Sequence, residues 1–119
     1  MPYVDGFVTP VKKDKIEAYR AHAELAGGIW REHGALEFHE CIADDVQPGK
    51  VTSFPQAVQL QEDEVVFFSW IVYNSRAERD AINDKVMNDP RLADMMDPAN
   101  FPFDGKRMFW GGFESFVSL

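Results

Sequence analysis

The most apolar part of the chain is a run from Val65 to Tyr73, which ends at Asn74-Ser75. It is rich in β-branched and aromatic residues and too short for a typical buried helix, so it predicts a strand. Alternate positions of a strand point to opposite faces of the sheet. One face would carry Val66, Phe68, Trp70 and Val72, and the other Phe67, Ile71 and Tyr73. Because both faces are apolar, we expect cover on both sides, although one layer of helices covers only one.

A strand and a helix are predicted at the start of the chain. Residues 3–9 alternate as a strand does, and Pro10 would close it. The helix would begin at the capping-box pair Asp14 and Glu17 and end at Gly34. Gly27-Gly28 lies inside it and costs about 1 kcal/mol per glycine relative to Ala. We therefore expect a kink there, or the close approach of another backbone.

Residues 36–44 predict a second strand, followed by an unusually long connection. One face of this strand would carry Leu36, Phe38, Glu40 and Ile42. Residues 45–63 form a longer link than a compact domain normally leaves unstructured. We expect a turn at Pro48-Gly49, and then either a strand extension or a short helical turn near Phe54-Pro55.

The last third of the chain predicts a second helix and a final strand. Ser75 and Glu78 form a capping box for a helix that runs to about residue 88. Residues 92–96 predict one more helical turn and residues 97–104 a loop. The final strand lies within residues 106–118, where Gly111-Gly112 predicts a bulge or bend.

The resulting order, βαββαβ, predicts an α+β fold of the ferredoxin-like type, as a single domain over residues 1–119. Its antiparallel sheet has both helices on one face, which leaves the other face bare. Such an apolar face is larger than a monomer usually exposes. We therefore predict a homodimer in which two sheets face each other, a dimeric α+β barrel.

Charge and composition narrow the range of partners. The chain has 119 residues, a formal net charge of −8 and a single cysteine, Cys41. RNA-recognition domains share this strand order, but the acidic balance and the lack of Lys or Arg in the central strand argue against nucleic acid. No run of about 18 apolar residues exists to cross a membrane, and the first residues lack the pattern of a signal peptide. We expect a cytoplasmic protein that binds neither nucleic acid nor membrane.

Glu40 is the main candidate for chemistry. It shares a strand face with apolar residues, so under the helices its pKa would be raised and it would suit proton transfer. A structural ion pair is the alternative. Arg79 and Asn83 lie on one side of the second predicted helix and would reach either Glu40 or an anionic ligand. For Arg79 the alternative is an ion pair with a strand carboxylate that ties the helix to the sheet.

Further candidates are Asp5, as an edge charge or a pocket base, and His39 as a ligand contact. Trp70, with Trp30 and Trp110, would form the wall of an aromatic cleft, unless these side chains are simply core. The histidines have no metal-ligand spacing, and no second cysteine is present, so we predict neither metal nor cofactor.

Several segments resemble the YbaA-like family of bacterial domains of unknown function. They are Val4-Asp5-Gly6-Phe7-Val8, His33-Gly34-Ala35-Leu36, Glu40-Cys41, Phe68-Ser69-Trp70-Ile71, Arg79-Asp80-Ala81, Phe103-Asp104-Gly105-Lys106-Arg107-Met108 and Gly111-Gly112-Phe113-Glu114. The resemblance implies the dimeric α+β barrel superfamily, whose members include cofactor-free monooxygenases, haem-degrading enzymes and small-molecule isomerases. It implies no established reaction for the family itself.

Together these features predict a homodimeric protein that binds an unknown small molecule in a cleft between sheet and helices. One hypothesis is a cofactor-independent enzyme with acid/base or monooxygenase-like chemistry. In that hypothesis Glu40 transfers a proton, Arg79 and Asn83 anchor the ligand, and Trp70 forms a wall. The alternative is a non-catalytic binding or regulatory dimer whose polar residues satisfy one another. Association with RNA is a third and remote hypothesis.

Overall fold

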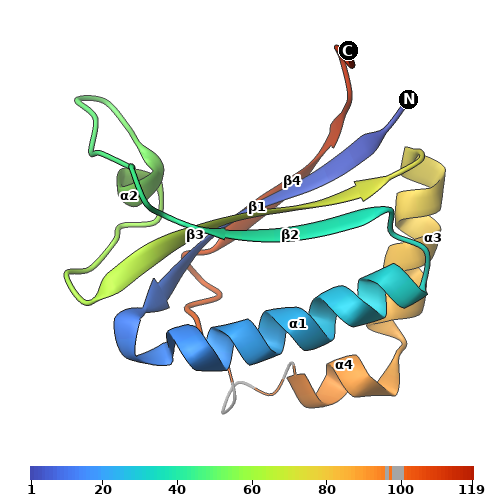
Figure 1. The fold of residues 1–119 in the computed structure, drawn as a ribbon, viewed down its shortest axis with the longest axis horizontal. Helices are drawn as coiled ribbons and strands as arrows, with labels where there is room; N and C mark the ends of the chain where they lie inside the picture. Colours follow the sequence, from blue (N-terminus) through green and yellow to red (C-terminus); the bar gives the residue numbers. More distant parts are fainter. Residues whose placement is uncertain (96, 98–100) are drawn as a thin grey trace.

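The computed structural model describes residues 1–95, 97 and 101–119, which form a four-stranded sheet and its helices (Figure 1). In chain order the elements are β1 (Tyr3–Lys12), a 3-10 turn (Lys13–Lys15), α1 (Ile16–Glu32), β2 (Glu37–Ile42), α2 (Phe54–Ala57), β3 (Glu64–Tyr73), α3 (Arg76–Met87), α4 (Pro90–Met95) and β4 (Phe109–Glu114). Within this part of the chain no helix is long and apolar enough to cross a membrane.

The sheet has the strand order β2-β3-β1-β4, and all neighbouring strands are antiparallel. Helices α1, α3 and α4 lie on one side of it, and the short α2 lies on the other (Figure 1). This is the predicted ferredoxin-like α+β fold. The helix-covered face of β3 carries Phe67, Ile71 and Tyr73, which are all buried.

Strand β1 is longer than the sequence predicted and runs to Lys12, because Pro10 lies inside it opposite Val66. The prediction that Pro10 closes the strand is wrong. Pairing of β1 with β4 ends at Val8, so at Pro10 the strand is an edge strand, where a residue without an N–H is tolerated.

Helix α1 begins at Ile16, after the 3-10 turn, and no side chain caps it. The predicted Asp14–Glu17 capping box is therefore wrong, because β1 runs on to Lys12 and the 3-10 turn makes the corner. At Gly27 the close neighbour is the ring of Phe38 on β2, not another backbone, while Gly28 has open space around it. Gly34 adopts a φ of 117°, which favours glycine, just after the helix end as predicted.

Helix α3 begins as predicted, with the Ser75 hydroxyl accepting a hydrogen bond from the Glu78 N–H at 3.2 Å. The predicted turn over residues 92–96 corresponds to α4, although Met96 lies outside the described residues. Residues 98–100 of the predicted loop lie outside them too.

Strand β4 pairs residue for residue with β1, from Phe109 opposite Val8 to Glu114 opposite Tyr3. The predicted bulge at Gly111-Gly112 is therefore wrong. Gly112 serves a different purpose, because a Cβ at this position would collide with the Arg79 guanidinium and the Tyr3 ring. The glycine lets Arg79 lie across the strand.

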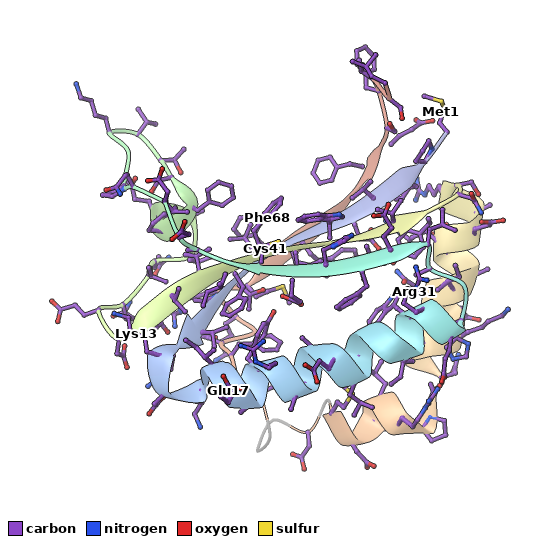
Figure 2. All side chains as sticks on the ribbon, in the orientation of Figure 1. Met1, Lys13, Glu17, Arg31, Cys41 and Phe68 are labelled. Carbon is purple, nitrogen blue, oxygen red and sulfur yellow. The ribbon has the colours of Figure 1, made fainter. Side chains whose placement is uncertain are left out.

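The sheet face opposite α1 is only partly covered by the chain itself. The connection after β2 forms a helical turn, as one of the two alternatives predicted, and places Val58 against Val8 and Val66. Beyond this cover, Phe68 is 43% exposed and Phe113 is 66% exposed. Figure 2 shows Phe68 on the side of the sheet away from α1. A large apolar surface therefore remains open.

The contact between Gly27 and Phe38 gives a test of how tightly α1 packs on β2. In Gly27→Ala the new Cβ would lie 2.6 Å from the Phe38 ring, whereas in Gly28→Ala it meets nothing within 4 Å. Both variants gain the same helix propensity. Urea denaturation should therefore show Gly27→Ala to be less stable than Gly28→Ala by about 1–3 kcal/mol. Equal stabilities would contradict the close packing.

Candidate ligand site between the sheet and helix α1

A cavity of about 420 Å³ lies between the helix-covered face of the sheet and helices α1 and α3. Its walls are mainly aromatic and include Phe7, Trp30, Phe38, Phe103 and Trp110. The polar side chains that reach it are Asp5, Thr9, Tyr19, His22, Glu40, Ser69 and Asn83. Among the described residues, no Lys or Arg lines this cavity. It therefore combines apolar walls with acidic and neutral polar groups.

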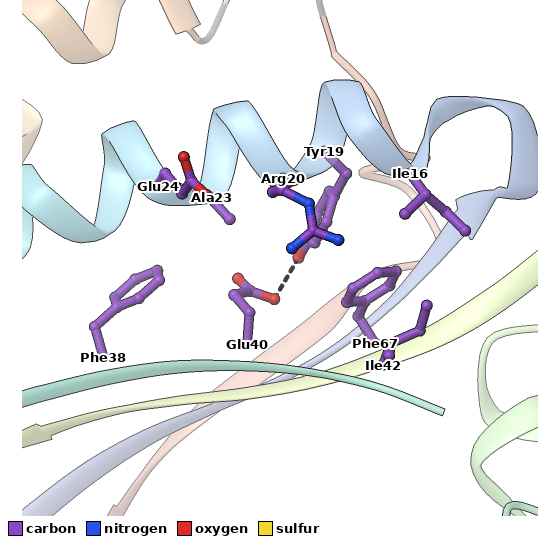
Figure 3. A pocket seen from close by; sticks show the side chains of 9 residues that line it. All are labelled: Ile16, Tyr19, Arg20, Ala23, Glu24, Phe38, Glu40, Ile42 and Phe67. Carbon is purple, nitrogen blue, oxygen red and sulfur yellow. Dashed lines mark hydrogen bonds between the residues drawn. The ribbon is translucent and has the colours of Figure 1, made fainter. Parts of the chain in front are cut away.

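A second, smaller pocket of about 250 Å³ lies between α1 and β2 (Figure 3). It shares Tyr19, Ala23, Phe38 and Glu40 with the larger cavity. In Figure 3, Tyr19 from α1 and Glu40 from β2 point toward each other across the gap between helix and sheet. These two side chains thus form part of the wall of both pockets.

Glu40 is held by hydroxyl groups. The Tyr19 hydroxyl donates a hydrogen bond of 2.8 Å to Glu40 Oε1. Burial raises the pKa of Glu40 above its ordinary value, although the hydroxyls of Tyr19 and Ser69 oppose the shift by stabilising the carboxylate. Burial, with the nearby Glu40, also raises the pKa of Tyr19, so Tyr19 remains a phenol that donates. A carboxyl group of raised pKa is suited to exchanging a proton near neutral pH.

Asp5 lies on the same sheet face and is only 1% exposed. Arg79 Nε donates to Asp5 Oδ1 at 3.1 Å, and the Tyr73 hydroxyl donates to Oδ2 at 2.9 Å. The rest of the Arg79 guanidinium binds Asp80 at 2.9 Å and the Tyr3 hydroxyl at 3.2 Å. Arg79 therefore points to Asp5. Of the predicted alternatives for Arg79, the ion pair with a strand carboxylate is the one observed, and Arg79 does not reach Glu40. The edge-charge alternative for Asp5 is wrong.

Asn83 joins α3 to α1 at the far end of the cavity. Its Oδ1 accepts a hydrogen bond of 3.0 Å from Trp30 Nε1 and lies 3.3 Å from the Tyr73 hydroxyl. Among the described residues, no group accepts a hydrogen bond from its Nδ2. Asn83 thus lines the cavity as predicted from its helix face, but it does not reach Glu40.

Trp70 and His39 lie on the opposite side of the sheet. Their rings stack on each other with centroids 4.8 Å apart, and His39 Nε2 is 3.0 Å from Glu37 Oε1. The prediction that Trp70 forms a wall of this cleft is wrong, because the strand positions that face the cavity are Ser69 and Ile71. Trp30 and Trp110 do line it.

Sequence reasoning assigned no role to Tyr19, Tyr73 or His22. Tyr19 carries a hydroxyl within the apolar stripe of α1, and that is a signal the sequence does contain. The contact between Tyr73 and Asp5 spans 68 positions and has no local signal. Among the described residues, no group of three or more His, Cys, Asp or Glu side chains is placed to hold a metal ion.

Residues 2–105 of the sequence match the model of a family described as "Protein of unknown function (DUF1428)". The "Uncharacterized protein YbaA" of Escherichia coli strain K12 is 52% identical over 117 residues, which cover 98% of each chain. The protein of the same name from Shigella flexneri matches to the same extent.

Solved structures share the fold at low sequence identity. A dimeric ferredoxin-like protein from an uncultured marine organism has a TM-score of 0.61 at 10% identity and covers all of both chains. A putative antibiotic biosynthesis monooxygenase from Nitrosomonas europaea has a TM-score of 0.57 at 14% identity and covers 97% of this chain and 90% of its own. An uncharacterized NIPSNAP domain protein from Burkholderia xenovorans has a TM-score of 0.57 at 12% identity, with 99% of each chain covered. These likenesses show the fold alone.

The pairing of Arg79 with Asp5 predicts a large difference between two arginines of α3. Arg79→Met would leave the buried Asp5 carboxylate without its cation, which costs about 3–5 kcal/mol. Arg76→Met removes an exposed arginine whose Nε lies 3.7 Å from Asp80, and should change stability by less than about 0.5 kcal/mol. Urea denaturation of both variants measures the difference. A similar loss in the two would contradict the assignment of Arg79 to Asp5.

Proposed function

The chain belongs to the DUF1428 family of proteins of unknown function, and from its cavity we propose that it is a homodimeric small-molecule-binding protein. The ligand is a flat, mainly apolar molecule held between the sheet and α1. Glu40 exchanges a proton with this ligand, with Tyr19 positioning the carboxyl group.

The cavity is the main structural evidence for this proposal. Its volume of about 420 Å³ falls within the range of ligand pockets, roughly 300–1,000 Å³. Mainly apolar walls with a few converging polar groups are typical of sites that bind small organic molecules. Tyr19, Glu40 and Ser69 supply such a polar group on one wall.

The position of Glu40 supports proton exchange. It faces the large cavity on one side and, on the other, the smaller pocket rimmed by the exposed Arg20 and Glu24. A proton taken from a ligand in the large cavity would leave through the smaller pocket to solvent.

The exposed apolar face of the sheet supports the dimer. Phe68, Phe109 and Phe113 are all at least 43% exposed on this face. A second copy placed face to face would cover them, and one protein of this fold is described as dimeric. A cytoplasmic location stays a prediction from the sequence.

A second function is a non-catalytic binding or regulatory dimer. It is favoured because the polar side chains of the cavity already form hydrogen bonds with one another. Glu40 is hydrogen-bonded to Tyr19, and Asp5 to Arg79 and Tyr73. In this alternative these groups stabilise the fold while the cavity binds its ligand unchanged. Monooxygenase-like chemistry, the activity in the description of one protein of the same fold, stays a prediction.

Filling the cavity should abolish ligand binding. The neutral aromatic dye N-phenyl-1-naphthylamine should bind saturably with a rise in fluorescence. Ala26→Leu places a larger side chain in the cavity wall and should weaken binding at least tenfold, which corresponds to about 1.4 kcal/mol. Ala21→Leu makes the same change on the exposed side of α1 and should leave binding unaltered. Equal binding by both variants, or none by the wild type, would overturn the cavity as the ligand site.

The proposed dimer predicts a sedimentation result. The wild type at micromolar concentration should sediment as a dimer, because burial of large aromatic side chains drives association. Phe113→Glu places a charge on the open face and should yield a folded monomer, judged by circular dichroism. A wild type that remains monomeric at this concentration would contradict the homodimer.

A further inference from the structure

We propose that the ligand of this cavity is an organic cation, a flat aromatic ring that carries a protonated alkylamine, whose N–H group binds the Glu40 carboxylate. This inference rests on the proposed function, because it names the class of molecule that the same cavity selects. It follows from the charges at the cavity, where the protein supplies a cationic partner for only one of two carboxylates.

Two carboxylates reach the cavity, and the protein neutralises only one of them. Asp5 has the Arg79 guanidinium at 3.1 Å and the Tyr73 hydroxyl at 2.9 Å. Glu40 has the Tyr19 hydroxyl at 2.8 Å, and among the described residues no cationic side chain lies within ion-pair distance of it. Arg79 cannot serve both sites. Glu40 therefore presents a charge without a counterion to the space where a ligand binds.

An unpaired carboxylate in apolar surroundings is unfavourable, and a cation brought by the ligand would relieve the cost. Hydroxyl groups stabilise the charge in part but bring no opposite charge. An anionic ligand would place a second negative charge beside Glu40, with no lysine or arginine among the described lining residues to balance it. The cavity thus favours cations and disfavours carboxylates and phosphates.

The basic side chains close to this region do not take the place of such a cation. Burial lowers the pKa of His22, so its ring is neutral at neutral pH. Arg20 lines the smaller pocket, where its Nε binds Glu17 at 3.1 Å, and its side chain is 62% exposed. Neither one neutralises Glu40 from inside the large cavity.

The walls of the cavity suit an aromatic cation as well. The cavity is lined by the rings of Trp30, Phe38, Phe103 and Trp110, and a cation held against the face of such a ring is attracted by its π electrons. Asn83 Oδ1 at the far end already accepts from Trp30, so an N–H group of the ligand finds its acceptor at Glu40. The net charge of −8 also attracts cations toward the protein.

Three indoles of similar size and different charge test the proposal. Tryptamine is a cation at neutral pH, tryptophol is its neutral analogue, and indole-3-propionate is the anion. Each would be titrated against the dimeric full-length protein at pH 8 by displacement of N-phenyl-1-naphthylamine. Tryptamine should bind at least about tenfold more tightly than tryptophol, a difference of about 1.4 kcal/mol. Indole-3-propionate should bind most weakly.

Two matched variants assign the preference to one carboxylate. Glu40→Gln should remove the advantage of tryptamine over tryptophol while leaving the affinity of tryptophol within about twofold, less than 0.5 kcal/mol. Glu62→Gln makes the same change of net charge on an exposed residue that lines neither pocket, and should keep the advantage. Melting temperatures of both variants show whether they fold. The ranking of the three probes on the wild type tests the proposal without any variant.

The preference should also depend on pH. Tyr19, Arg20 and Glu24 on α1 and Ser69 on β3 surround Glu40. Of these, Tyr19 remains protonated over the range from pH 5 to 8, because burial raises its pKa. As pH falls, Glu40 gains a proton and His22 gains a charge, and both changes should weaken tryptamine binding. Binding of tryptophol should change much less.

The outcomes separate this inference from the proposed function. If tryptophol or indole-3-propionate binds as tightly as tryptamine, or if no indole displaces a dye that binds the cavity, the cationic class is wrong and the cavity remains a ligand site. If Glu62→Gln removes the preference as fully as Glu40→Gln does, the selection is a general surface effect and the role of Glu40 is wrong. If the dye itself fails to bind in the cavity, the proposed function falls.

Discussion

The ion pair between Arg79 and Asp5 organises the inner face of the sheet. It joins α3 to β1 across 74 positions of sequence, with the Asp5 carboxylate almost completely buried. The same guanidinium also binds the Tyr3 hydroxyl, and Gly112 on the neighbouring strand leaves the space it occupies. Gly112 in β4 and Arg79 in α3 are thus parts of one arrangement. It holds α3, β1 and β4 together around the buried Asp5 carboxylate.

Because Arg79 is held by Asp5, the ligand cavity keeps a second carboxylate without a cation. Glu40 lies among aromatic side chains with hydroxyl partners, so burial raises its pKa. The folded protein therefore binds a proton on Glu40 at pH values where the unfolded chain has released it. Ionisation of Glu40 lowers the stability of the fold as pH rises from the unfolded toward the folded pKa. The partial burial of Glu40 makes it costly to ionise, which is uncommon for a residue with a purely structural role. It suits a binding site in which the ligand supplies the opposite charge.

The sequence was sufficient to predict most elements and the order of the sheet, because alternating and helical periods are local patterns. It also placed Glu40 on an apolar strand face and Asn83 on the buried side of its helix. The partner of Arg79 was not predictable in this way, since the choice between Asp5 and Glu40 depends on how α3 lies over the sheet. Alternation likewise divided β3 into two faces without telling which one the helices cover, and this is why Trp70 was placed in the cleft. Pro10 and Gly112 were misinterpreted for a related reason: each is explained by a neighbouring strand or helix rather than by its own segment.

Titration of the side-chain carboxyl carbons by NMR tests the central claim, that Glu40 is a half-buried carboxylate without a cationic partner. Glu24, exposed on α1, serves as the reference within the same molecule. The account predicts that the titration midpoint of Glu40 lies clearly above that of Glu24. A Glu40 midpoint at or below that of Glu24 would contradict the account.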